Sequence, residues 1–278
     1  MYLRRQFKEL TIKDSFMFGA VMLDEENCRG LLEMVLGIAI SRVEVSQEKS
    51  IVYHPEYKGI RLDVYAQDEK NTRYNIEMQV VRKDDLGRRA RYYHSQIDME
   101  LLLRGGNYAE LPDTFVIFIC DFDPFGEEKY CYTFETRCVE DECIRLGEGS
   151  ISIFLSTHGK NEKEISPELV KFLRFVKADL DGSQRDYEDK YISQLQQSIR
   201  CIKESRMMEE RYMLFEEMLR DERAEGKAED VLDLLAESGP VSDDLRVRIM
   251  SEKDMEVLKR WLRLSVEVSS PEEFLEKM

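Results

Sequence analysis

The chain has 278 residues, of which 42% are hydrophobic and 10% aromatic, and this composition excludes a disordered protein. Its 41 basic and 57 acidic residues give a formal net charge of −16, which excludes strong phosphate binding by the surface as a whole. No apolar run approaches the roughly 20 residues of a membrane span, and the opening MYLRRQFKEL lacks a secretory signal, so we expect a cytoplasmic protein with no membrane partner.

Helices are followed by extended segments in the first part of the chain. Residues 10–37 show helical spacing of their apolar side chains and predict two short helices, the second of which ends at Gly37. The next segment, residues 40–53, is extended. Two further extended segments, 59–67 and 73–81, are separated by the polar DEKNT and predict a β-hairpin.

The middle of the chain predicts a helix and then three strands, over residues 86–104, 114–122, 129–138 and 151–157. The apolar run TFVIFICDF is typical of a strand that is buried on both faces. The next helix begins in SPELVKFLRFVKADL, with Ser166 as its N-cap and Pro167 at its first position.

The sequence changes character near residue 184 and predicts three parts. Residues 1–183 form an α/β domain, residues 184–226 a charged helical arm, and residues 227–278 a small helical module. The arm lacks a clean heptad, so it does not predict a strong coiled coil. A homo-oligomer formed through this helical C-terminal region is compatible with the pattern.

Carboxylates gather on one face of the predicted hairpin. Because side chains alternate along a strand, Glu77 and Gln79 share a face. If the turn is centred near Lys70, paired residues have numbers that sum to about 140, and Asp63 faces Glu77. Two facing carboxylates repel unless a positive group lies between them, and Mg²⁺ is commonly held by one or two carboxylates. The alternative is a solvated polar face on which Arg61 screens the acids.

A basic stretch follows the hairpin directly, in VVRKDDLGRRARYY. Since the whole surface is acidic, any contact with nucleic acid must come from such a local patch or from a metal ion. Helical spacing places Arg88 and Arg91 on one face with Tyr92, Ser95 and Gln96. A metal site beside basic and aromatic side chains suits a phosphodiester substrate, whereas the alternative is an ordinary amphipathic helix with a charged outer face.

Asp63, followed after thirteen residues by Glu77 in a Glu-x-Gln motif, resembles the PD-(D/E)xK nuclease superfamily. More narrowly, LTIKDSFMFGAVM, RLDVYAQDE, YNIEMQ, RRARYYHSQID and FVIFICDFDPF, in this order, resemble the bacterial family of recombination-promoting nucleases or transposases. The resemblance implies an α/β, restriction-endonuclease-like core with a central mixed sheet flanked by helices, and an α-helical C-terminal region.

The resemblance also implies roles for single residues. Asp63 and Glu77 would bind Mg²⁺, with Mn²⁺ as a substitute, and Asp14 matches an acidic position near the metal, although it also suits a helix N-terminus. Gln79 stands where the superfamily usually has Lys. Because Gln cannot accept a proton at pH 7, we expect metal-bound hydroxide to be the nucleophile in a slow, strictly metal-dependent enzyme.

Tyr93 and Gln96 match the Tyr and Gln that often face the site from the following helix in that family. Together with Arg88 and Arg91 they are the predicted substrate-binding residues. His94 lies on the same helix and is the histidine to test. Asp121 and Asp123 in CDFDPF are more typical of a turn before Pro124 than of a second metal site.

The implied activity is that of a metal-dependent DNA endonuclease. It would hydrolyse a phosphodiester bond to 5′-phosphate and 3′-hydroxyl ends, in recombination, mobile-element transfer or phage defence. Two alternatives stay open. One is a catalytically weak nuclease-fold protein that acts as a DNA- or protein-binding regulatory module, which the acidic surface favours. The other is a nuclease that acts on RNA.

Overall fold

The computed structural model describes residues 6–51 and 60–278, and the side chains of residues 47–51, 60 and 61 are outside this description. The last part of the extended segment predicted at 40–53, and the first residue of the one predicted at 59–67, therefore lie outside the described residues. The chain divides into two compact units, Met1–Ser205 and Arg206–Met278, and each is described by itself.

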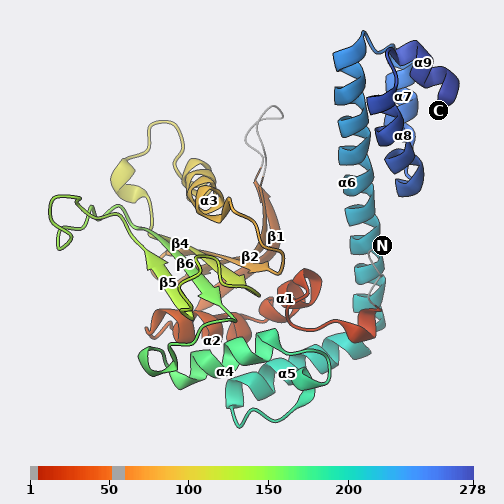
Figure 1. Cartoon of the computed structure of the whole chain (residues 1–278). Coiled ribbons are helices and arrows are strands. Elements are labelled where there is room, and N and C mark those ends of the chain that lie inside the picture. Colours follow the sequence, from red (N-terminus) through yellow and green to blue (C-terminus); the bar gives the residue numbers. More distant parts are fainter. Residues whose placement is uncertain (1–5, 52–59) are drawn as a thin grey trace. The chain divides into compact units, whose positions relative to one another are not determined.

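A mixed sheet forms the centre of the first unit (Figure 1). Its strands lie in the order β1-β2-β3-β4-β6-β5. Neighbours are antiparallel from β1 to β3, parallel across β3, β4 and β6, and antiparallel between β6 and β5. The strands are β1 (Val43–Ile51), β2 (Ile60–Asp68), β3 (Arg73–Gln79), β4 (Thr114–Cys120), β5 (Cys131–Phe134) and β6 (Ser150–Ser156).

Helices cover both faces of this sheet. Figure 1 shows α3 on one face and α1, α2, α4 and α5 on the other. The helices are α1 (Ser15–Met22), α2 (Glu25–Leu36), α3 (Leu86–Leu101), α4 (Pro167–Lys177) and α5 (Lys190–Glu204). Short 3₁₀ helices lie at η1 (Phe7–Glu9), η2 (Tyr108–Glu110), η3 (Glu162–Glu164) and η4 (Gly182–Gln184). The predicted α/β core with a mixed sheet flanked by helices is confirmed.

Local sequence signals explain where the helices begin and end. Gly37 ends α2 in the left-handed conformation, with φ of 66°, which glycine adopts at no steric cost. Ser166 caps α4 by accepting a hydrogen bond from the backbone N–H of Leu169, and Pro167 occupies the first turn. These three features are as predicted. The helix predicted at 86–104 is shorter, because the chain turns extended at Leu102.

The hairpin of β2 and β3 has the predicted register. Val64 pairs with Ile76 and Gln67 with Arg73, so that partner numbers sum to 140. The side chain of Asp68 holds the turn between the strands, since its Oδ1 accepts hydrogen bonds from the backbone N–H groups of Lys70 and Thr72, each at 2.9 Å. The register follows from the alternation of apolar and polar side chains and from this turn.

One side of the sheet packs against α3. The apolar face of α3 contacts aromatic and aliphatic side chains of β2, β4 and β6 in a single buried cluster. Its α3 members are Leu86, Ala90, Tyr93 and Ile97, and its strand members include Tyr65, Val116, Phe118, Cys120 and Phe154. This packing fixes the rotation of α3, and therefore decides which of its charged side chains face the sheet.

The second unit consists of α6 (Arg206–Ser238), α7 (Asp243–Ser251), α8 (Met255–Glu267) and α9 (Pro271–Lys277). Its core joins the C-terminal half of α6 to the three shorter helices through Ala228, Val231, Leu235, Leu258, Trp261 and Phe274, among others. The predicted helical C-terminal region is confirmed. The predicted domain boundaries after residues 183 and 226 stay predictions, and the second falls inside α6. Within the described residues, we find no helix that is both long and apolar enough to cross a membrane.

Candidate active site

Strands β2 and β3 separate at the end of the hairpin that lies away from the turn. Their pairing reaches Val64 and Ile76. Beyond this point β2 continues beside β1 as far as Ile60, and β3 continues beside β4 as far as Gln79. The two strands thus form a fork within the sheet, and backbone N–H groups at the fork need other partners.

Asp63 and Glu77 supply those partners. The backbone N–H of Asp63 donates to Glu77 Oε1 at 3.3 Å, and the N–H of Met78 donates to Asp63 Oδ2 at 3.1 Å. Each carboxylate therefore lies across the fork against the other strand. Glu77 is buried, with 5% of its surface exposed. The structure brings together the two acids that the sequence places opposite each other.

The electrostatics of this pair are unfavourable without a further positive charge. Burial, and then the neighbouring carboxylate of Asp63, raise the pKa of Glu77 to about 8, and the guanidinium of Arg89 opposes this rise. Burial and the second carboxylate therefore favour the protonated form of Glu77 in the protein alone. A divalent cation at the pair would replace that proton.

Among the described residues, Arg89, from the first turns of α3, is a cation that contacts Glu77. Its Nη2 lies 3.5 Å from Glu77 Oε2 and donates to the hydroxyl of Tyr93 at 2.8 Å, while its Nη1 donates to Gln79 Oε1 at 2.8 Å. The guanidinium carbon lies 5.3 Å from the ring centre of Phe118 and 5.5 Å from that of Tyr93. One side chain thus connects Glu77, the amide of Gln79 and the aromatic rings of Tyr93 and Phe118.

Arg89 lies in the basic stretch of the sequence but is not among the predicted site residues. The available signal was its spacing, because Arg89 precedes Tyr93 by four residues and so lies on the same side of the helix. The charge pattern instead pointed to Arg88 and Arg91, whose side chains are exposed in the structure.

Gln79 is held at both ends of its amide. Its Oε1 accepts from Arg89, and its Nε2 donates to the carbonyl oxygen of Val81 at 2.5 Å. The residue is buried, with 8% of its surface exposed. Its side chain is therefore oriented by two partners and lies beside Glu77 on the same face of β3.

The other predicted site residues differ in whether they are connected to Arg89 and the carboxylate pair. Tyr93 belongs to it through Arg89, and Gln96 is buried further along α3. Asp14 precedes α1, and its carboxylate accepts hydrogen bonds from the backbone N–H and the hydroxyl of Thr11 at 2.7 and 3.2 Å. The role of Asp14 near a metal stays a prediction, as do the roles of Tyr93 and Gln96. The side chain of Arg61, the alternative partner of the acids, lies outside the described residues.

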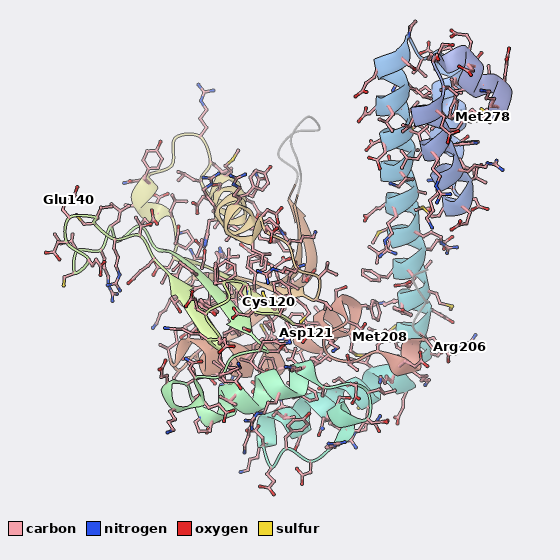
Figure 2. The ribbon with its side chains drawn as sticks, viewed as in Figure 1. Cys120, Asp121, Glu140, Arg206, Met208 and Met278 are labelled. Carbon is pink, nitrogen blue, oxygen red and sulfur yellow. The ribbon has the colours of Figure 1, made fainter. Side chains whose placement is uncertain are left out.

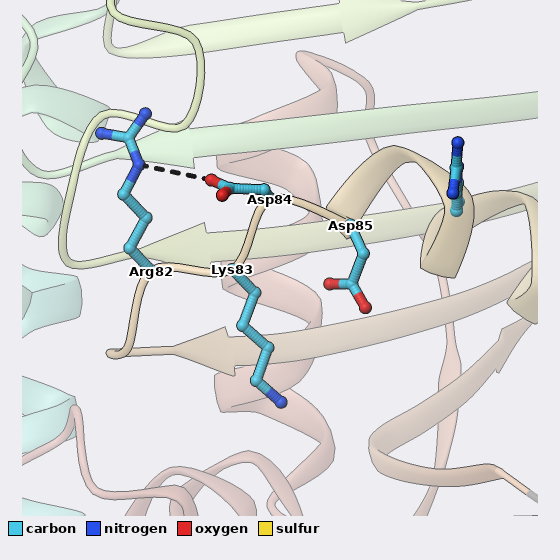
Figure 3. A pocket seen from close by; sticks show the side chains of 5 residues that line it. Arg82, Lys83, Asp84 and Asp85 are labelled. Carbon is cyan, nitrogen blue, oxygen red and sulfur yellow. Dashed lines mark ion pairs between the residues drawn. The ribbon is translucent and has the colours of Figure 1, made fainter.

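Charged side chains line a cavity of about 620 Å³ between β3 and α3 (Figure 3). They belong to Arg82, Lys83, Asp84, Asp85 and Arg88. One ion pair is formed there, between Arg82 Nε and Asp84 Oδ1 at 3.8 Å. The segment begins three residues after Gln79, so its three cations flank the carboxylate pair along the chain.

The aspartates at the end of β4 have structural partners. Asp121, which follows Cys120 in the middle of the first unit (Figure 2), accepts hydrogen bonds from Lys13 Nζ at 3.2 Å and from the hydroxyl of Thr157 at 2.8 Å. Asp123 accepts from the backbone N–H groups of Phe125 and Glu128 at 3.1 and 2.7 Å, as a turn residue does. The arrangement matches the predicted turn before Pro124.

His94 connects α3 to the sheet. Its Nδ1 and Nε2 lie 2.7 and 3.1 Å from the hydroxyl oxygens of Thr114 and Ser152. Burial lowers the pKa of His94 to about 4, so the imidazole is neutral at physiological pH. These contacts give His94 a packing role at a distance along α3 from Arg89.

The donor set at the fork fits a hard divalent cation. Two carboxylates lie together, one of them buried and with its pKa raised, and oxygen ligands of this kind suit Mg²⁺ or Mn²⁺. In the part of the chain that the structure describes, no cluster of three or more His, Cys, Asp or Glu side chains could hold a metal ion. Asp63 and Glu77 would therefore hold the ion as a pair, with water or phosphate oxygens completing the shell.

One comparison with known proteins identifies a family for this chain. The model of the family described as PD-(D/E)XK nuclease family transposase matches residues 15–229, which include Asp63, Glu77, Gln79 and Arg89. Searches of curated proteins and of solved structures found no match.

Proposed function

We propose that this chain, which belongs to the PD-(D/E)XK nuclease family transposases, is a metal-dependent endonuclease that hydrolyses phosphodiester bonds of DNA. The family supports a nuclease or transposase-like function and a divalent metal ion. The observation that carries the finer proposal is the pair formed by the half-buried Asp63 and the buried Glu77, each of which accepts a backbone hydrogen bond from the other strand across the fork of β2 and β3.

Asp63 and Glu77 would hold the cation, Mg²⁺ or Mn²⁺. When bound, the ion would supply Lewis-acid stabilisation of the charge that develops on the phosphate and would lower the pKa of water. The protein groups hold the carboxylates in position through the backbone N–H groups of Asp63 and Met78. The groups around Glu77 also exclude bulk water from its carboxylate. The lower local dielectric constant strengthens the electrostatic interactions of this carboxylate.

The reaction is the addition of water to phosphorus with loss of the 3′ oxygen. The water oxygen forms the new bond to phosphorus, the bond from phosphorus to the 3′ oxygen breaks, and the 3′ oxygen takes up a proton from solvent. The water gives its own proton to solvent, since Gln79 cannot accept one at pH 7. Gln79 instead orients groups at the site through its amide, and the products are a 5′-phosphate and a 3′-hydroxyl.

Arg82, Lys83 and Arg88 support the choice of a phosphodiester substrate. They line the cavity that follows β3, beside the carboxylate pair in the chain. With Arg91, they would contact phosphates on either side of the bond to be cleaved, which positions the duplex without reading its sequence. A role in recombination, mobile-element transfer or phage defence belongs to the same proposal.

One observation favours a second function, that of a catalytically weak DNA- or protein-binding module. The contact between Arg89 and Glu77 partly neutralises the carboxylate pair without a metal ion. A site that is stable in this form would bind a divalent cation weakly and cleave slowly. The endonuclease function requires Asp63 and Glu77 for cleavage, whereas the binding function does not depend on cleavage.

A plasmid-nicking assay with Mg²⁺ or Mn²⁺ tests the choice. The variants are Asp63→Asn and Glu77→Gln, and Glu110→Gln, at an exposed position of η2, is the matched control. The endonuclease proposal predicts nicking by the wild type and the control and a loss of at least about 100-fold in both site variants. Equal nicking by all four proteins would refute the assignment of the site, and no nicking by any would favour the binding module. The same assay on an RNA duplex decides between the two nucleic acids.

A further inference from the structure

The guanidinium of Arg89 is held in place by more contacts than an ion pair requires. It donates to Gln79 and to Tyr93, both at 2.8 Å, and it stacks against Phe118 and Tyr93. Its distance to Glu77, 3.5 Å, is the longest of its polar contacts. The position of Arg89 is therefore determined mainly by Gln79, Tyr93 and the aromatic rings, and only weakly by the carboxylate.

We propose that Arg89 binds a non-bridging oxygen of the phosphate that is cleaved, and thereby supplies the positive charge that Gln79 cannot. This inference rests on the proposed nuclease function. Arg89 would be a catalytic residue, because its guanidinium touches the reacting phosphate, and its contact with Glu77 would be the arrangement of the protein without metal and substrate.

The number of donors on the side chain supports this role. A guanidinium has five N–H donors in one plane. One is directed at Gln79, one at Tyr93 and one at Glu77, so the plane can keep its first two bonds while the third changes partner. An arginine that is already oriented loses less rotational freedom on binding a phosphate than a free one does.

Charge and exposure agree with an exchange of partners at Glu77. The side chain of Arg89 is 22% exposed, whereas that of Glu77 is 6% exposed, so Arg89 is the more accessible member of the ion pair. A cation bound by Asp63 and Glu77 would satisfy the carboxylate that Arg89 now contacts. The N–H group directed at Glu77 would then face the region where an anionic ligand of that cation lies.

The competing explanation is that Arg89 only holds Gln79 and Tyr93 in place. The two explanations predict opposite changes in metal binding. If Arg89 is a substrate-binding cation that competes with the metal for Glu77, then its removal leaves the metal with one competitor fewer, and metal binding becomes tighter. If it is a structural support, then its removal disorders the site and weakens metal binding.

The experiment compares Arg89→Met and Arg89→Lys with Arg104→Met, an exposed arginine beyond the end of α3 that serves as the control. Circular dichroism establishes which proteins are folded. Three quantities are measured on each full-length protein: Mn²⁺ affinity by electron paramagnetic resonance, affinity for a short DNA duplex in Mn²⁺, and the single-turnover rate of plasmid nicking.

We expect Arg89→Met to bind Mn²⁺ about threefold more tightly than the wild type, and to nick plasmid at least about 100-fold more slowly. Arg89→Lys keeps the positive charge but not the planar set of five N–H donors, so it should recover part of the nicking rate. Arg104→Met should match the wild type. If Arg89→Met loses Mn²⁺ affinity together with nicking rate, the inference is overturned. If only Arg89→Lys folds, a loss of Mn²⁺ affinity in that variant overturns it.

The outcome for Arg89 is separable from that for the proposed function. If the wild type binds Mn²⁺ and DNA but never nicks it, then the nuclease proposal fails, and Arg89 is judged by its effect on duplex affinity in Mn²⁺. A loss of about tenfold in Arg89→Met relative to Arg104→Met would support phosphate binding. Unchanged duplex affinity would refute it.

Discussion

The raised pKa of Glu77 predicts that the carboxylate pair destabilises the protein without metal as the pH rises. The unfolded chain releases the proton of this carboxyl near its ordinary pKa of 4.5, whereas the folded protein releases it at about 8. Between these values the folded state binds more protons than the unfolded state, so the free energy of unfolding falls as the pH rises. Below pH 4.5 both states are protonated and the penalty is absent.

The size of the effect follows from this difference in pKa. One pKa unit corresponds to about 1.4 kcal/mol, which makes the full penalty on the order of 5 kcal/mol above pH 8. Relaxation of the fork and entry of water reduce the cost of a buried charge. We therefore expect Glu77→Gln to gain about 2–5 kcal/mol of stability over the wild type between pH 5 and pH 9, because Gln does not titrate and its Oε1 can still accept the hydrogen bond from Asp63.

Calorimetric unfolding in the presence of a chelator measures this gain. The single tryptophan, Trp261, lies in the second unit, so its fluorescence follows that unit separately and should not respond to the variant. Glu110→Gln is the control, since the residue is exposed. A difference between Glu77→Gln and the wild type that is the same at pH 5 and pH 9 would refute the electrostatic account of the pair.

Three further predictions concern metal, substrate and packing. Mn²⁺ at 100 times its Kd should raise the free energy of unfolding of the wild type by about 2.7 kcal/mol at pH 8. The affinity of the wild type for Mn²⁺ should fall at pH 6, because protons then compete with the metal for Glu77. Calorimetry that shows the same stabilisation by Mn²⁺ in Glu77→Gln would contradict this prediction. Arg88→Ala and Arg91→Ala should each weaken DNA binding and lower the slope of log affinity against log salt by about 1. Fluorescence anisotropy over a salt series measures that slope, and an unchanged slope in both variants would exclude these arginines as phosphate contacts. His94→Leu should cost about 1–3 kcal/mol of stability through its lost contacts with Thr114 and Ser152, with Mn²⁺ affinity unchanged in titrations. A folded His94→Leu protein that no longer binds Mn²⁺ would show that His94 belongs to the site.

The register of the hairpin could be predicted because it depends on local information. Side chains alternate strictly along a strand, and the polar turn around Lys70 determines which residues face each other. Asp63 and Glu77 therefore meet as expected. The fork could not be predicted in this way, since it depends on β2 staying with β1 while β3 stays with β4, and the latter contact joins segments far apart in the chain.

The place of Arg89 was not predicted, because the rotation of a helix about its axis is set by packing. The basic residues of this segment suggest Arg88 and Arg91 as substrate-binding residues, and this role stays a prediction. The apolar residues Leu86, Ala90 and Ile97 turn toward the sheet, and this orientation brings Arg89 to within 3.5 Å of Glu77. The apolar stripe, rather than the charge pattern, carries the information on which arginine lies at the centre.

The division into two units was also beyond what composition could show. The predicted arm at 184–226 is charged throughout, so nothing in its composition marks the end of α5 at Glu204 or the start of α6 at Arg206. The helical character of this region follows from its composition, whereas the place where one unit ends depends on which helices share a core.

The central claim is that Asp63 and Glu77 together hold one divalent cation. A crystal soaked in Mn²⁺ and measured by anomalous diffraction tests it directly, because Mn²⁺ gives a much stronger anomalous signal than the sulfur atoms of the protein. We expect one strong peak beside the carboxylates of Asp63 and Glu77. A peak elsewhere, or carboxylates that stay paired with Arg89 in saturating Mn²⁺, would contradict it.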